Sequence, residues 1–140
     1  MIVIDASIAL KWVVEEPGSE HAARLLELDE IFGAPDILFA EVANVLCKKV
    51  RGGMTSSRQA AVSLAELRRA IGRVGSTVAL FDASLRLAIQ LNHSAYDCFY
   101  LAMAGDGELV TADEAFVRKC RAADVKTMVR SAAEAIDARQ

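Results

Sequence analysis

The first residues of the chain place the strongest constraint on its fold. Ile2, Val3 and Ile4 form a short apolar, β-branched run, which is typical of a strand buried on both faces. Asp5 ends this run, and Ser7 lies at the start of a helical pattern of apolar residues. Ligands of open parallel sheets bind outside the carboxyl ends of the strands. We therefore expect Asp5 to lie in a functional site, as the first ligand of a divalent metal ion.

The rest of the chain repeats this alternation of strand and helix. Short apolar runs predict four more strands, at 31–34, 77–81, 108–111 and 125–128. Helical patterns lie between them, including one over 38–51 and another from 55 to about 74. This alternation predicts an α/β fold, a three-layer α/β/α sandwich with a mainly parallel five-stranded sheet. We expect residues 1–140 to form a single domain.

Composition narrows the class of protein further. The chain is 54% hydrophobic and 25% charged, as in compact globular proteins. No apolar run approaches the ~18 residues of a membrane span, and Met1 leads directly into a strand, so we expect a cytoplasmic protein. A net charge of −3 argues only weakly against a nucleic-acid partner, because local fields differ from the total. The cysteines lack disulfide or zinc spacing and are predicted to be buried: Cys47, Cys98 and Cys120.

Four acidic residues occupy equivalent places in this predicted fold. Asp5 and Asp113 follow strands, whereas Glu41 and Asp97 lie near the start of helices that begin at the same edge of the sheet. Four carboxylates brought together would repel one another unless a cation neutralised them. Oxygen ligands without His or Cys suit Mg²⁺ or Mn²⁺. Such an ion activates water for phosphodiester hydrolysis, so the pattern predicts a metal-dependent phosphodiesterase.

Four short segments together form a recognisable pattern: Val3-Ile4-Asp5-Ala6-Ser7 with Lys11-Trp12, Glu41 with Asn44, Tyr96-Asp97-Cys98-Phe99-Tyr100-Leu101-Ala102, and Thr111-Ala112-Asp113. In this order they resemble the PIN-domain ribonucleases, and among them the VapC toxins of bacterial toxin–antitoxin pairs. The resemblance implies a Mg²⁺- or Mn²⁺-dependent endoribonuclease, a homodimer, and inhibition by a small VapB-type antitoxin. It also implies that the four acids are the family's acidic quartet and that Ser7 is its hydroxyl residue. Cys98 departs from the alanine more usual there.

One face of the predicted helix 38–51 carries further candidate residues. At about 100° per residue, Glu41, Asn44 and Lys48 share one side of this helix, and Arg51 lies beside it. We expect Asn44 to form a hydrogen bond that supports a metal ligand. Lys48 and Arg51 are candidate contacts for RNA phosphates.

Each acid also has a purely structural interpretation. Asp5 and Asp113 can be helix N-caps, and Ser94 with Asp97 has the spacing of a capping box. Asp113 can reach a metal through water as readily as directly. We interpret Asp36 and Asp82 as ordinary helix caps.

Two other functions fit parts of the pattern. A receiver-type phosphoacceptor domain is also α/β, but it needs paired acids after the first strand, where only Asp5 is present, and it has no use for Glu41. A PIN-like module that binds metal or RNA without hydrolysis has the same fold. His21 and His93 are isolated in the sequence, so we expect no pair of imidazoles acting as acid and base.

Overall fold

Five short parallel strands form the centre of the computed structural model, which describes residues 1–140. Their order across the sheet is β3-β2-β1-β4-β5, and every neighbouring pair is parallel. The strands are β1 (Ile2–Ile4), β2 (Phe32–Pro35), β3 (Arg73–Gly75), β4 (Glu108–Val110) and β5 (Met128–Arg130). The predicted parallel five-stranded sheet is confirmed.

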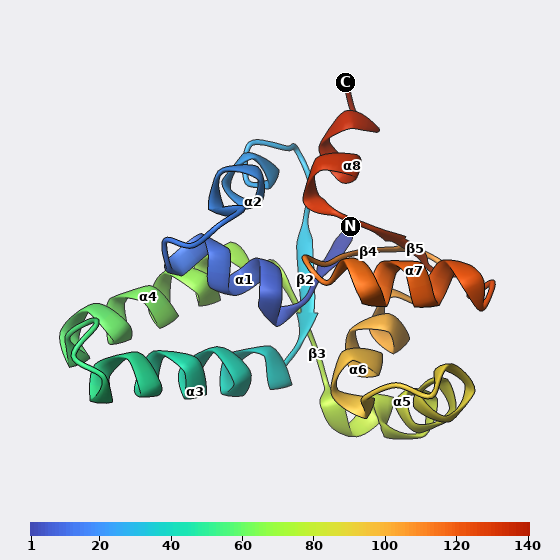
Figure 1. Ribbon diagram of the computed structural model, residues 1–140, viewed down its shortest axis with the longest axis horizontal. Helices are drawn as coiled ribbons and strands as arrows, with labels where there is room; N and C mark the ends of the chain where they lie inside the picture. The colour runs from blue at the N-terminus through green and yellow to red at the C-terminus, as the bar shows by residue number, and fades with distance from the viewer.

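Eight helices surround this sheet. They are α1 (Ala6–Val13), α2 (Ser19–Leu25), α3 (Ile37–Arg51), α4 (Ser57–Ala70), α5 (Thr77–Leu91), α6 (Ala95–Ala104), α7 (Glu114–Ala122) and α8 (Ala132–Asp137). In Figure 1, α1 to α4 lie to the left of β2, and α5 to α7 lie to its right. Helices therefore cover both faces of the sheet, as the α/β/α prediction requires. None of them combines the length and the apolar character needed to cross a membrane.

The central strand explains why the first residues are so apolar. Ile2, Val3 and Ile4 are each at most 1% exposed and belong to one core cluster of 28 buried residues. β1 pairs with β2 on one side and with β4 on the other. Because helices cover both faces as well, no side chain of β1 can reach solvent. Asp5, the next residue, is the first polar group at the carboxyl edge.

The strand predicted at 77–81 is wrong, because these residues form the first turns of α5. A short apolar run does not distinguish a strand from a helix by its period alone. The third strand is instead Arg73–Gly75, which was predicted as the end of a helix. β3 lies at the edge of the sheet and is largely exposed, so its sequence lacks the apolar signature of a buried strand. The fifth strand was also predicted too early, at 125–128.

Three smaller predictions need correction as well. Asp82 lies inside α5 and caps no helix. Asp36 precedes α3 but forms no cap bond with it, and its carboxylate instead accepts hydrogen bonds from the backbone N–H (3.0 Å) and the hydroxyl of Thr77. Cys47 is exposed, whereas Cys98 and Cys120 are buried as predicted. Burial raises the pKa of each buried thiol to about 11, so both remain protonated.

Candidate active site

Asp5 lies where the strand order reverses, at the carboxyl end of β1 between β2 and β4. It is only 6% exposed. Its carboxylate accepts hydrogen bonds from Ser7 Oγ at 2.5 Å, from Thr111 Oγ1 at 2.5 Å and from the backbone N–H of Ile8 at 3.2 Å. The last bond caps α1, so Asp5 is an N-cap. Its remaining bonds hold both carboxylate oxygens in one orientation.

Thr111 is a site residue that the sequence analysis did not single out. β1 and β4 pair in register, with Ile4 opposite Val110, so the next residues of the two strands, Asp5 and Thr111, lie side by side. The two hydroxyls are themselves fixed by the loop after β4. Ser7 Oγ accepts from the N–H of Ala112 at 2.9 Å, and Thr111 Oγ1 accepts from the N–H of Asp113 at 3.0 Å.

Glu41 approaches the same edge from α3. Its Oε1 accepts a hydrogen bond of 2.7 Å from the hydroxyl of Tyr100. Tyr100 belongs to α6 and is only 1% exposed. Partial burial raises the pKa of Glu41, the Tyr100 hydrogen bond opposes this, and the charges of Asp97 and Asp5 raise the pKa further. Burial together with the charge of Glu41 raises the pKa of Tyr100 far above its usual value, so Tyr100 stays a donor.

Asp97 lies in the first turn of α6, with its side chain 37% exposed. Its Oδ2 is 2.6 Å from Nε2 of His93. The capping-box interpretation is wrong, because the Ser94 hydroxyl accepts from the N–H of Tyr96 and the Asp97 carboxylate bonds to His93. His93 is therefore not isolated, and its position four residues before Asp97 was the signal that could have revealed it.

Three of the four predicted acids interact electrostatically, because the charge of one raises the pKa of another. Burial raises the pKa of Asp5, although Ser7, Thr111 and Ile8 donate to it, and the charge of Asp97 adds to the rise. Neither Asp5 nor Glu41 forms a salt bridge with a Lys or Arg. The sheet therefore gathers Asp5, Glu41 and Asp97 at one edge without supplying a cationic side chain to neutralise Asp5 or Glu41.

Asp113 stands apart from these three acids. It caps α7, accepting from the N–H of Phe116 at 3.0 Å, and its side chain is exposed. Its charge is not among the causes that shift the pKa of Asp5 or Glu41. Its role as a metal ligand stays a prediction.

The helix face predicted to support the site is exposed. Asn44, Lys48 and Arg51 all lie on the solvent side of α3. Asn44 forms no side-chain hydrogen bond to any of the acids. These three residues are available to a partner or substrate.

The donor set fits a hard divalent cation. Asp5, Glu41 and Asp97 offer only carboxylate oxygens, and these are the ligands of Mg²⁺ and Mn²⁺. The side chains do not form a ready-made cage, since no group of three or more His, Cys, Asp and Glu side chains lies close enough to hold a metal ion. Like charges repel, and a bound cation would reduce this repulsion.

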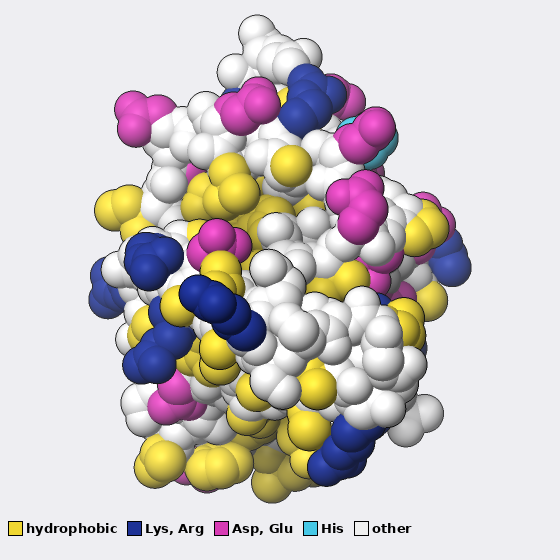
Figure 2. All heavy atoms as spheres, turned by 90° about the vertical axis from the view of Figure 1, so that its left-hand side faces the viewer, with side chains coloured by type: hydrophobic (Ala, Val, Ile, Leu, Met, Phe, Trp, Pro, Cys, Tyr) yellow, Lys and Arg dark blue, Asp and Glu magenta, His cyan; other side chains and the backbone are white.

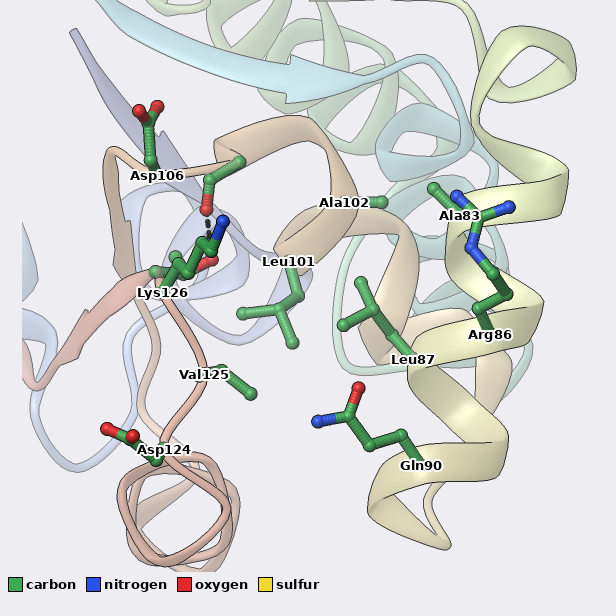
Figure 3. Close-up of a pocket in the computed structure, with 12 residues that line it drawn as sticks. Ala83, Arg86, Leu87, Gln90, Leu101, Ala102, Asp106, Asp124, Val125 and Lys126 are labelled. Carbon is green, nitrogen blue, oxygen red and sulfur yellow. Dashed lines mark hydrogen bonds between the residues drawn. The ribbon is translucent and has the colours of Figure 1, made fainter.

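A cavity lies elsewhere, at the other end of α6. Its volume is about 680 Å³, and Leu87 and Gln90 of α5 line it opposite Leu101 of α6 and Val125. Figure 3 shows these side chains, and the acids among the lining residues are Asp106 and Asp124. We therefore place the candidate site at the carboxyl edge and not in this cavity.

Comparison with known proteins identifies the fold family. The PIN domain matches residues 2–122 of the chain. The chain belongs to the PIN-domain family. It is 30% identical over 122 residues to Ribonuclease VapC3 of Pyrobaculum aerophilum. The matched region covers 84% of this chain and 93% of that protein. The predicted resemblance to the VapC type of PIN domain is confirmed.

Solved structures agree with this assignment of the fold. PAE2754 from Pyrobaculum aerophilum superposes with a TM-score of 0.71 at 20% identity, covering 99% of this chain and 90% of its own. VapBC2 from Rickettsia felis, solved bound to a DNA fragment from its promoter, has a TM-score of 0.65 at 15% identity, covering 94% and 98%. The strand order also differs from the 2-1-3-4-5 order of receiver domains, so the receiver alternative is wrong.

Proposed function

We propose that this PIN domain, working as a single domain, is a divalent-metal-dependent endoribonuclease and the toxin of a toxin–antitoxin pair. The observation that carries the proposal is the group of Asp5, Glu41 and Asp97, whose charges act on one another at one edge of the sheet. The similarity to Ribonuclease VapC3 supports RNA as the substrate. An RNA substrate in turn favours the cytoplasm as the place of action.

Each residue of the site has a part in the proposed reaction. Asp5, Glu41 and Asp97 would hold a Mg²⁺ or Mn²⁺ ion, and Asp113 would reach it through water. Such an ion polarises a phosphoryl group and lowers the pKa of bound water from 15.7 towards neutrality. Attack by that water would leave 5′-phosphate and 3′-hydroxyl ends.

The supporting hydrogen bonds orient these ligands before substrate arrives. Ser7 and Thr111 each donate to one oxygen of Asp5, and Tyr100 donates to Glu41. These donors leave the carboxylates little freedom to rotate, so less order has to be imposed when the ion binds.

Basic side chains on α3 and α4 are candidate contacts for RNA phosphates. Lys48 and Arg51 lie on the exposed face of α3, and Arg68 and Arg69 lie on α4. Figure 2 shows Lys and Arg side chains on the left-hand side of Figure 1, where α3 and α4 lie. We propose that Lys48 and Arg51 bind the backbone of the substrate, with affinity that falls as salt rises.

A small VapB-type antitoxin is the proposed protein partner. This proposal rests on the resemblance to VapC toxins and on the name of the relative, Ribonuclease VapC3. Co-expression with the product of the neighbouring gene, followed by affinity purification, tests it. Failure of that product to co-purify or to inhibit cleavage would contradict the toxin assignment.

The proposed homodimer has a candidate surface on α5. One face of this helix exposes large apolar side chains at helical spacing, namely Val78 (76%), Phe81 (54%), Leu85 (58%) and Ile89 (72%). Asp82 and Arg86, one turn apart on the same helix, form no salt bridge within the chain. An antiparallel second α5 would bring Asp82 of one copy opposite Arg86 of the other.

Sedimentation velocity tests the dimer. Leu85→Glu places a charge in the proposed interface and should convert a dimer to a monomer. Leu26→Glu is the matched control, because Leu26 is also exposed (46%) but lies directly after α2, away from this face. A wild-type monomer, or a dimer that Leu85→Glu leaves intact, would refute this interface.

Two experiments test the enzymatic proposal. Purified protein with Mg²⁺ or Mn²⁺ should cut RNA, and chelation should stop it. Sequencing of RNA ends after induction should find new 5′-phosphate ends with wild type and none with Asp97→Asn. Asp106→Asn is the control, since Asp106 lies in an exposed turn at the far end of α6. RNA binding without cleavage would identify the chain as the non-hydrolytic module instead.

A further inference from the structure

His93 occupies a fixed place between α5 and α6. Asn92 ends α5 in the left-handed conformation, with φ of 47°, and the N–H of His93 returns to the carbonyl of Ala88 at 3.0 Å. This turn aims the imidazole at α6, where its Nε2 is 2.6 Å from Oδ2 of Asp97. On its other side the ring contacts α7.

Two side chains of α7 hold the imidazole from the other side. Phe116 stacks on it, with ring centroids 4.6 Å apart and planes inclined by 19°. Lys119 Nζ is 3.2 Å from Nδ1 of His93 and also donates to the carbonyl of Asn92 at 3.1 Å. The ring is therefore confined by stacking and by a polar contact at each nitrogen.

The contact with Lys119 determines which nitrogen carries the proton. An ammonium group has donors and no acceptor, so Nδ1 of His93 has to accept from Lys119. The ring proton is then on Nε2, where it donates to Oδ2 of Asp97. In this tautomer the ring N–H is aimed at the carboxylate of Asp97.

We propose that His93 is a positioning residue for Asp97: its Nε2–H holds Oδ2, leaves Oδ1 without a hydrogen-bond partner, and so prepares Asp97 to receive the metal ion. Lys119 and Phe116 fix the ring in the required tautomer and orientation. The proposal rests on the metal-dependent function proposed above. Partners of this kind typically contribute about 10- to 100-fold to metal affinity.

Three substitutions separate the hydrogen bond from the bulk of the ring. His93→Phe keeps an aromatic ring against Phe116 but removes both polar contacts. His93→Gln restores an N–H donor near the position of Nε2. Lys119→Met keeps the length of the side chain and removes its charge. His21→Phe is the matched control, because His21 is exposed on α2 and has no side-chain hydrogen bond.

The readouts are Mn²⁺ affinity by calorimetry and the ring tautomer by ¹⁵N NMR, both on the full chain, with thermal unfolding as a check on the fold. Wild type should show His93 protonated at Nε2, and His93→Phe should unfold at nearly the same temperature but bind Mn²⁺ about 10- to 100-fold more weakly. His93→Gln should recover most of the affinity, Lys119→Met should lose less than His93→Phe, and His21→Phe should match wild type.

Two negative results are distinguishable. Wild type that binds no Mn²⁺ and cuts no RNA overturns the proposed function and this inference with it. Wild type that binds Mn²⁺, with a folded His93→Phe that binds it equally well, overturns the inference alone. A His93 ring protonated at Nδ1 in wild type also overturns it. If His93→Phe fails to fold, an Nδ1–H tautomer of His93 in wild type still refutes the proposal.

Discussion

The acidic residues at the two edges of the sheet have different partners. At the amino edge, Glu108 accepts from Arg139 at 2.6 Å and pairs with Arg130 at 3.2 Å. Glu30, beside it, is 3.1 Å from Arg139. At the carboxyl edge, Asp5 and Glu41 have only hydroxyl and backbone donors.

Their pKa values follow this difference. Although partial burial acts to raise the pKa of Glu30, hydrogen bonds from the amino group of Met1 and from Arg139 lower it. Burial and the neighbouring carboxylates raise the pKa of Asp5 and of Glu41. The amino edge is thus neutralised by the chain's own cations and serves stability. The carboxyl edge keeps unneutralised charge on Asp5 and Glu41, which costs stability and which a metal ion would neutralise in the proposed function.

The largest expected effect is on activity at the carboxyl edge. Asp5→Asn removes a charge from the site but can still cap α1, so the fold should survive. Cleavage of RNA should fall by about 100-fold or more, the usual effect of losing one group that stabilises a transition state. A single-turnover cleavage assay measures this. Wild-type rates in a folded Asp5→Asn protein would reduce Asp5 to a helix cap.

The second largest effect is expected from a divalent ion, which should stabilise the folded protein by binding at the carboxyl edge. An ion that binds only the folded state stabilises it by about 2.7 kcal/mol at 100 times its Kd. Mn²⁺ should therefore raise the unfolding temperature of wild type at pH 7, but not that of the double variant Asp5→Asn, Asp97→Asn. Equal stabilisation of both proteins would show that the ion binds elsewhere.

Loss of a cation at the amino edge should affect stability and leave catalysis unchanged. Arg139→Met leaves Glu30 and Glu108 with fewer partners and should cost about 1–2 kcal/mol in urea unfolding. Arg118→Met is the control, because the Arg118–Glu114 pair is 3.8 Å long and both side chains are largely exposed (72% and 85%). It should change stability by less than about 0.5 kcal/mol.

The smallest effect is expected from Glu41→Gln, which should stabilise the metal-free protein. Glu41 has a raised pKa, so the folded state holds this proton more tightly than the unfolded state does. The resulting penalty is absent below the unfolded value of 4.5 and develops as the pH rises through the folded pKa. At pH 7 the variant should gain a few tenths of a kcal/mol, and the difference should vanish near pH 4. A difference that does not change with pH would contradict this account.

The sequence predicted the positions of the acids better than their partners. Asp5, Glu41 and Asp97 could be placed because the ends of parallel strands and the starts of the following helices share one edge. The roles of Thr111 and Tyr100 were not predicted, because their hydrogen bonds depend on strand register and on how α3 packs against α6. The first turns of α5 were predicted as a strand because their apolar residues face solvent and form a short run like that of a strand.

The pairing of β1 with β4 has a consequence for the synthesis of this chain. Residues 2–4 of β1 pair with residues 108–110 of β4. The central strand therefore lacks one of its two neighbouring strands while most of the protein is being translated. Asp5 meets Thr111 only after that point. A nascent chain therefore lacks the hydrogen bond between Asp5 and Thr111 until β4, the fourth of the five strands in chain order, has been synthesised.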